Sequence, residues 1–334
     1  MLKLLKRPPW TLGATGLFTF NRKSMDFKQL FPNASLIEHQ GHIIPLELTP
    51  PSSIKDFSKL FFPCPRGVIS VAGADRTSFL NGLGPTDLRQ FKPGEGRRML
   101  ITNQHGHLLF DSYIWGLEDR ILIFAEPGEE HKLIQFMQFY AITEAVEFRQ
   151  LEPTDFEFCV TFGYAKSSVT GCFEIEKNEG FAVLGAPNTI SLSQSLLNLG
   201  FLAIGFELYE ELRPMVGLAR SGVDFSSENL PQEAGLEPYM SFQKGCYLGQ
   251  EPISRIAFRG RVRKHLEQIT SDEPLSAGQV LTGLNGEVGQ VTSPSNLQST
   301  SGYHALAYLS AQAHTGPIWA GSIKVFVPAK NNNP

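Results

Sequence analysis

The chain has 334 residues, of which 42% are hydrophobic and 19% are charged, and its formal net charge is −4. This composition is typical of a globular protein with a substantial core, and the length predicts two or three domains. The slight acidic excess argues against general affinity for nucleic acid, although it is compatible with a local basic patch. The sequence contains no apolar run of the roughly 18 residues that a membrane-spanning helix needs, so we expect no membrane partner.

The acid-free N-terminal stretch 1–25 carries Lys3, Lys6, Arg7, Arg22 and Lys23. A basic leader without acidic residues is typical of an organelle transit peptide, which would place the protein in the mitochondrial matrix. The alternative is a bacterial N-terminal tail, or a start at Met25. We favour the bacterial tail and a cytoplasmic location, because the prolines of the Pro-Pro-Trp run at 8–10 would interrupt an amphipathic helix.

Hydrophobic periodicity predicts strands and helices in alternation along the chain. In chain order we expect a strand over 68–71, a helix capped by Asp75, strands over 99–102, 108–115 and 121–124, a helix over 131–140, further strands within 145–185, a helix over 191–199, and a small all-β domain at the C-terminal end. Asp111 lies within an otherwise apolar strand, and a half-buried carboxylate needs a partner.

The four cysteines are far apart in sequence: Cys64, Cys159, Cys172 and Cys246. Their spacing fits neither a zinc motif, nor a thioredoxin-like motif, nor a secreted disulfide framework, so a reducing compartment is expected. His105 and His107 flank a glycine in a turn and have no third ligand nearby in sequence, so we interpret them as solvated turn residues. We therefore predict no permanently bound metal.

The densest chemistry lies in the segment Lys244-Gly245-Cys246-Tyr247-Leu248-Gly249-Gln250-Glu251. A thiolate is favoured beside a cation or a helix N-terminus, and Pro252 suits the first turn of a helix. In an extended segment Lys244 and Cys246 would point the same way. This predicts an exposed, electropositive cysteine at the mouth of a site. The competing interpretation is a tight turn with a buried cysteine and a surface lysine.

Basic residues follow this segment, with Arg255 first and then Arg259, Arg261 and Arg263. In a strand the last three would share one face, forming a ladder of guanidinium groups suited to carboxylates or phosphates. The alternative is a solvated, charged face.

The string Lys-Gly-Cys-Tyr-x-Gly-Gln-Glu, followed by Arg255 and Gly260, resembles the signature of the YgfZ family, the folate-binding, iron–sulfur-related branch of the GcvT-like aminomethyltransferase superfamily. Weaker similarity covers 73–87, 103–111, 231–236 and 275–293, whereas 1–50 and 150–205 carry little signal. The resemblance implies an α+β fold with two mixed lobes and a small C-terminal β-barrel around a central folate cavity. The expected boundaries are 1–25 for an extension, 26–150 for the first lobe (which can be discontinuous), 151–262 for the second lobe and 263–334 for the barrel.

The resemblance also implies a function and the residues that carry it. Cys246 and Lys244 match the family's important cysteine and lysine, within a motif that continues with Gly245, Tyr247, Gly249, Gln250, Glu251 and Arg255. Tetrahydrofolate or a one-carbon derivative is the implied cofactor, with Tyr209, Asp111, Arg259 and Arg261 as candidate contacts. The implied role is support of iron–sulfur enzymes, including those that thiolate tRNA, with client enzymes or cluster-assembly proteins as partners and no known standalone reaction.

Two further functions remain as alternatives. The chain could be an aminomethyltransferase of the glycine cleavage type, although that branch lacks the cysteine signature. It could also be an RNA-binding module that uses the arginine ladder, with tRNA as the partner.

Overall fold

The computed structural model describes residues 35–39, 42–47, 57–152, 155–163, 169, 172–177, 180–187, 189–260 and 262–328. The extension predicted over 1–25 lies outside these residues. A short hairpin, β1 (Ser35–His39) with β2 (His42–Glu47), precedes the main body of the fold. Within the described part of the chain, no helix is both long enough and apolar enough to cross a membrane.

The first sheet contains five antiparallel strands in the order β5-β6-β7-β4-β8. They are β5 (Gly96–Thr102), β6 (Leu108–Gly116), β7 (Arg120–Ala125), β4 (Gly67–Ala72) and β8 (Glu147–Leu151). Helices α2 (Arg76–Gly82) and α3 (Glu130–Tyr140) bury Leu80, Leu133 and Met137 against it. The predicted strands and both helices are therefore confirmed. The Asp75 side chain, however, accepts a hydrogen bond from the Ala145 amide instead of capping its own helix.

The second sheet has the order β10-β11-β9-β3-β12. Its strands are β10 (Phe173–Lys177), β11 (Phe181–Pro187), β9 (Phe156–Phe162), β3 (Leu60–Pro63) and β12 (Leu202–Ala203), and α4 (Leu192–Asn198) covers its outer face. Strand β3 comes before the first sheet in the chain, yet it pairs antiparallel with β9 and parallel with β12. The two sheets are thus interleaved in sequence, while the residue boundaries of the lobes stay a prediction.

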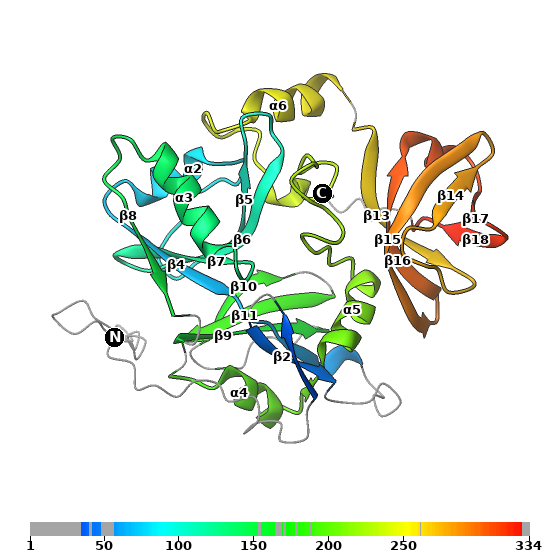
Figure 1. Ribbon diagram of the computed structural model, residues 1–334, viewed down its shortest axis with the longest axis horizontal. Coiled ribbons are helices and arrows are strands. Elements are labelled where there is room, and N and C mark those ends of the chain that lie inside the picture. The colour runs from blue at the N-terminus through cyan, green and yellow to red at the C-terminus, as the bar shows by residue number, and fades with distance from the viewer. Residues whose placement is uncertain are drawn as a thin grey trace, which may run out of the picture.

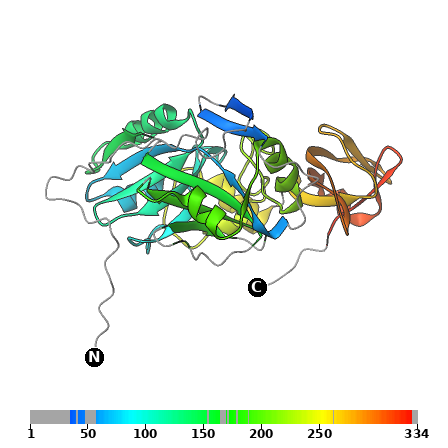
Figure 2. The same cartoon turned by 90° about the horizontal axis from the view of Figure 1, so that it is seen from below.

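The main hydrophobic core lies between the two sheets. Phe124 and Tyr113 from the first sheet meet Phe158 and Phe62 from the second, and Tyr209 joins them from α5 (Phe206–Met215). Burial of large aromatic side chains is the dominant favourable term in such a core. Figures 1 and 2 show the two sheets as one body with the C-terminal strands beside it.

The C-terminal strands form a closed barrel in the order β13-β16-β15-β14-β17-β18. The strands are β13 (Lys264–Ser271), β14 (Val280–Gly283), β15 (Gly286–Ser299), β16 (Gly302–Ser310), β17 (Ile318–Ala320) and β18 (Ile323–Phe326), with the short 3₁₀ helix η5 (Ala311–Thr315). Buried Arg213 of α5 ties the barrel to the second lobe, because it donates to Asp224 and to Ser293 of β15. The predicted α+β fold with a C-terminal β-barrel is confirmed.

Three remaining elements position the functional segment. The 3₁₀ helix η2 (Phe57–Lys59) leads into β3, and η4 (Glu237–Tyr239) precedes the predicted motif. Helix α6 (Gln250–Arg259) follows the motif directly, and Pro252 lies in its first turn as expected.

Candidate functional site

A cavity of about 150 Å³ lies where the two lobes meet the barrel. The first lobe contributes Arg98, the second contributes Phe181, and the barrel contributes Gln268. The other lining residues come from the loop after α5, from the lead-in to the motif and from the barrel: Gly217, Leu218, Ala219, Ala234, Gly235, Leu236, Pro238, Tyr239, Leu266 and Leu306. Most of these residues are apolar, but their backbone groups and the side chains of Arg98, Tyr239 and Gln268 make the cavity wall as polar as it is apolar.

The polar side of the cavity is built around Arg98. Its guanidinium makes a two-pronged ion pair with Asp111, with Nε–Oδ1 and Nη2–Oδ2 distances of 2.7 and 2.6 Å. Glu176 lies 3.7 Å from Nη1, and the Tyr239 ring lies 4.8 Å from the guanidinium carbon. The carboxylate that the sequence placed inside an apolar strand therefore has its partner on the neighbouring strand.

Glu176 is buried behind Arg98 and Tyr239 and is not among the described residues that line the cavity. Its Oε1 accepts a hydrogen bond from the Tyr239 hydroxyl, whereas Oε2 is buried and has no hydrogen-bond partner among the residues that the structure describes. Burial and the nearby Glu176 carboxylate raise the pKa of Tyr239, so the phenol remains a donor. The Oε2 oxygen of Glu176 has no surface open to the cavity, so Glu176 acts on the site by orienting Arg98 and Tyr239, which do line it.

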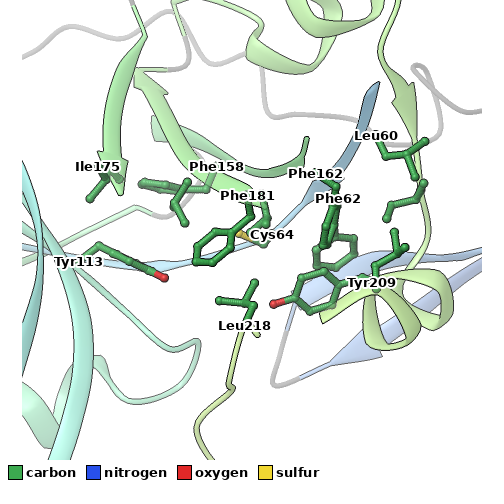
Figure 3. Packing of buried hydrophobic residues seen from close by; sticks show 14 of the residues in the cluster. Leu60, Phe62, Cys64, Tyr113, Phe158, Phe162, Ile175, Phe181, Tyr209 and Leu218 are labelled. Carbon is green, nitrogen blue, oxygen red and sulfur yellow. The ribbon is translucent and has the colours of Figure 1, made fainter. Parts of the chain in front are cut away.

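Tyr209 belongs to the core and is not among the described residues that line the cavity. Its ring stacks on Phe62 with centroids 4.4 Å apart and an interplanar angle of 20°. Figure 3 shows its hydroxyl and that of Tyr113 pointing into the space near Cys64 and Leu218. Burial raises the pKa of Tyr209. Its proposed contact with folate stays a prediction.

Cys246 is exposed on the loop between η4 and α6. Before the cysteine, the Ser241 amide donates to Pro85 O at 2.9 Å. After it, the Leu248 amide donates to Gly82 O at 2.9 Å, and the Thr102 hydroxyl donates to Leu248 O at 2.6 Å. The thiol is therefore displayed on a loop that is fixed on both sides, which excludes the interpretation with a buried cysteine.

Lys244 is buried, in contrast to Cys246. Its Nζ donates to three backbone carbonyls at the end of α2, with distances of 2.6 Å to Asn81 O, 2.8 Å to Gly84 O and 2.5 Å to Thr86 O. Burial lowers the pKa of Lys244 to about 8, although the Asp87 carboxylate opposes this shift. The expectation that the two side chains point the same way is wrong, because the backbone bends at 242–244 and strand alternation does not apply.

The remaining motif residues shape this loop and the start of α6. Gly249 has φ of 78°, and a Cβ there would lie 2.3 Å from Asn103 O, so the position requires glycine. Tyr247 is buried, and its ring lies 5.2 Å from Lys244 Nζ. Gln250 and Glu251 begin α6, and Arg255 is exposed on it.

A ladder of arginines would need a strand, and among the described residues neither Arg259 nor Arg263 lies in one. Arg259 is the last residue of α6, and Arg261 lies outside the described residues. Arg263 is exposed, as the interpretation of a solvated face expects, and folate contacts by Arg259 and Arg261 stay a prediction. In the described part of the chain, His, Cys, Asp and Glu side chains form no group of three or more that could hold a metal ion.

Sequence reasoning missed Arg98, Glu176 and Tyr239. The signal for Arg98 was present, since a buried carboxylate in one strand of a hairpin predicts a cation in the other. In that hairpin, Leu100 pairs with Asp111 and Arg98 with Tyr113. Glu176 reaches the site from the other lobe, so local sequence carries no signal for it.

Comparison with known proteins gives relatives at low identity, and no family model matches the chain. A chloroplastic protein of Arabidopsis thaliana named as a transferase is 24% identical over 276 residues, which is 74% of this chain and 64% of that protein. The mitochondrial iron–sulfur cluster assembly factor IBA57 of Mus musculus is 26% identical over 76% of this chain and 78% of its own length. This chain therefore spans a little less than two thirds of the plant relative.

A solved structure shows the same fold. The glycine cleavage system aminomethyltransferase T from Bartonella henselae aligns with a TM-score of 0.72 at 18% identity, covering 91% of this chain and 95% of that chain. At this identity the likeness establishes the fold alone.

Proposed function

We propose that this chain, which has the fold and homologues of the GcvT-like superfamily, is a YgfZ-type accessory protein that binds a reduced folate and supports iron–sulfur enzymes. The observation that carries the proposal is the pairing of two features: a cavity at the junction of the lobes with Arg98 and Tyr239 in its wall, and an exposed cysteine on an anchored loop. No standalone reaction is part of the proposal.

The cavity fits the pterin end of a folate. A pterin is a flat ring whose amino group, ring N–H and carbonyl form hydrogen bonds, and Arg98, Tyr239 and Gln268 supply polar groups among the lining residues. Phe181, Leu218 and Leu236 supply apolar walls. A cavity of about 150 Å³ is smaller than the roughly 300–1,000 Å³ of a pocket for a whole drug-sized ligand, so the folate tail would extend outside it. When bound, a reduced folate would supply a one-carbon carrier.

The Arg98–Asp111 pair favours the accessory role over aminomethyl transfer. Both Asp111 oxygens accept hydrogen bonds from the buried guanidinium, so the carboxylate is neutralised and held in place. A carboxylate whose oxygens both accept from an arginine is poorly suited to accept a hydrogen bond or a proton from a folate amine. The aminomethyltransferase alternative predicts release of methylene-tetrahydrofolate from an aminomethylated carrier protein in vitro. Detection of that product would favour aminomethyl transfer over the accessory role.

Cys246 is the proposed point of contact with iron–sulfur chemistry. Its thiol is exposed, while Cys64 and Cys159 are buried in the core. Clusters usually take four thiolates, so a single exposed cysteine would have to share any cluster with a partner. We therefore propose cluster-assembly proteins or client enzymes as partners, with tRNA-thiolating enzymes among the clients. Without the arginine ladder, the RNA-binding alternative has no supporting observation among the described residues.

The organellar names of the relatives favour the mitochondrial or chloroplast alternative over the bacterial cytoplasm as the proposed location. Sequencing the N-terminus of the native protein tests this, because an organellar protein is expected to begin well beyond Met25.

The functional test is complementation of cells that lack this protein. Cys246→Ser is expected to fold with an unchanged melting temperature and to leave cluster-dependent enzymes at low activity. Cys172→Ser is a matched control, because Cys172 is only partly buried and lies outside the site. Full enzyme activities in cells that carry Cys246→Ser would refute the role of this thiol.

A further inference from the structure

The cavity and the Cys246 loop are joined through one buried residue, Thr86. Its hydroxyl donates to the backbone oxygen of Tyr239 at 3.1 Å and accepts from the Leu100 amide at 3.0 Å. Its own carbonyl accepts from Lys244 Nζ at 2.5 Å. Thr86 is 6% exposed, so these bonds form away from bulk water, where polar contacts are strongest.

On the cavity side, Tyr239 is in direct contact with the polar group of the site. Its ring packs against Arg98, and its hydroxyl donates to Glu176. Tyr239 itself lines the cavity, so a ligand bound there would restrain Tyr239 and the backbone of η4. The backbone oxygen of the same tyrosine is the atom that Thr86 contacts.

On the loop side, Lys244 lies two residues before Cys246. Its ammonium group fixes the loop to the carbonyls of Asn81, Gly84 and Thr86. The thiol itself makes no part of this anchor and stays exposed. A change in the position or mobility of Thr86 thus changes the hydrogen bond from Lys244 that holds the Cys246 loop in place.

We propose that occupancy of the cavity controls the reactivity of Cys246 through a bridge of Tyr239, Thr86 and Lys244, in which Thr86 is a positioning residue. This inference rests on the proposed folate site. A ligand that stabilises Tyr239 stabilises the bridge, so the loop fluctuates less and the thiol reacts more slowly. The cavity and the loop are coupled when a bound ligand changes the free-energy difference between the ordered and the mobile loop. The alkylation rate of Cys246 then reports this change.

The experiment measures alkylation of Cys246 by iodoacetamide with and without 5-formyltetrahydrofolate, using mass spectrometry of the peptide. Folate binding is measured in parallel for every variant by fluorescence. Thr86→Val removes the hydroxyl and keeps the shape, whereas Thr86→Ser keeps the hydroxyl. Thr161→Val is the matched control, because Thr161 is a buried threonine of β9 whose hydroxyl donates within the second sheet.

In the wild type the folate is expected to slow alkylation about fivefold, the low end of usual coupling between sites. Thr86→Val is expected to bind folate and to show equal rates with and without it, while Thr86→Ser and Thr161→Val behave as the wild type. Hydrogen exchange of the amides over 241–248 in the wild type, slowed by folate, is a readout that does not depend on the folding of any variant.

The outcomes separate the two proposals. Folate binding without any change in the alkylation rate or hydrogen exchange of the wild-type loop overturns the coupling and leaves the folate site intact. An equal folate effect in wild type and Thr86→Val overturns the role of Thr86. Failure of the wild type to bind folate overturns the proposed site and the coupling together.

Discussion

The buried ammonium group of Lys244 makes a testable prediction about stability and pH. Burial lowers its pKa from 10.5 to about 8 in the folded chain. Between these two values the unfolded chain binds more protons than the folded chain, so stability rises with pH across this window. Integrated from pH 7 to pH 9.5, the linkage amounts to a gain of about 2 kcal/mol for the wild type.

Lys244→Met removes this titration and keeps a side chain of similar length. Urea denaturation of both proteins at pH 7 and pH 9.5 gives four free energies of unfolding, and titrations elsewhere cancel in the differences between the two proteins. The stability of the wild type relative to Lys244→Met is expected to rise by about 2 kcal/mol from the lower to the higher pH. A relative stability that stays constant or falls with rising pH would refute a desolvated ammonium group at this position.

Three further predictions concern the site. Gly249→Ala should lower the melting temperature by several degrees, because the added Cβ lies 2.3 Å from a backbone oxygen at positive φ; Gly245→Ala, which meets nothing within 4 Å, should leave it unchanged, and equal effects would contradict this account. Iodoacetamide should modify Cys246 in the folded protein and Cys64 only after denaturation, because burial raises the pKa of the Cys64 thiol; labelling of both in the native protein would be inconsistent with the structure. Arg98→Met should cost about 3–5 kcal/mol in urea denaturation by leaving two buried carboxylates without their cation, and a loss below about 1 kcal/mol would show that the pair is solvated.

Local patterns predicted most of the secondary structure. The apolar spacing of Leu133 and Met137 indicated α3, and the alternating strands on either side of the turn at Asn103 indicated the β5–β6 hairpin. These patterns were sufficient because each element buries one face against a neighbour that is close in sequence.

The predictions failed where backbone direction or distant pairing decides the outcome. Lys244 is buried while Cys246 is exposed because the chain bends at 242–244 and is not a strand, and a bend is not encoded in side-chain alternation. The arginines after Pro252 gave a strand-like alternation, but the helical burial of Ile253 and Ile256 determines the structure. Where charge alternation and apolar spacing conflict, burial of the apolar face has the larger free energy.

The cavity itself could be predicted only through a family resemblance. Its polar group joins Arg98 of β5 to Glu176 of β10 and to Tyr239 of η4, three segments that are far apart in sequence. Convergence of this kind depends on how the lobes pack, and the spacing of residues along the chain does not report it.

The central claim is that the cavity binds the pterin of a reduced folate beside Arg98 and Tyr239, which Glu176 orients. The direct measurement is the dissociation constant of 5-formyltetrahydrofolate for the wild type, for Glu176→Gln and for Glu157→Gln, a control at a buried glutamate of β9 whose carboxylate accepts from the Ser193 amide. Glu176→Gln removes the charge next to Arg98 and weakens the hydrogen bond that orients Tyr239, so it is expected to weaken binding about tenfold, which is about 1.4 kcal/mol. The control should bind as the wild type does. Equal affinities for Glu176→Gln and the wild type, or no binding by the wild type, would contradict the claim.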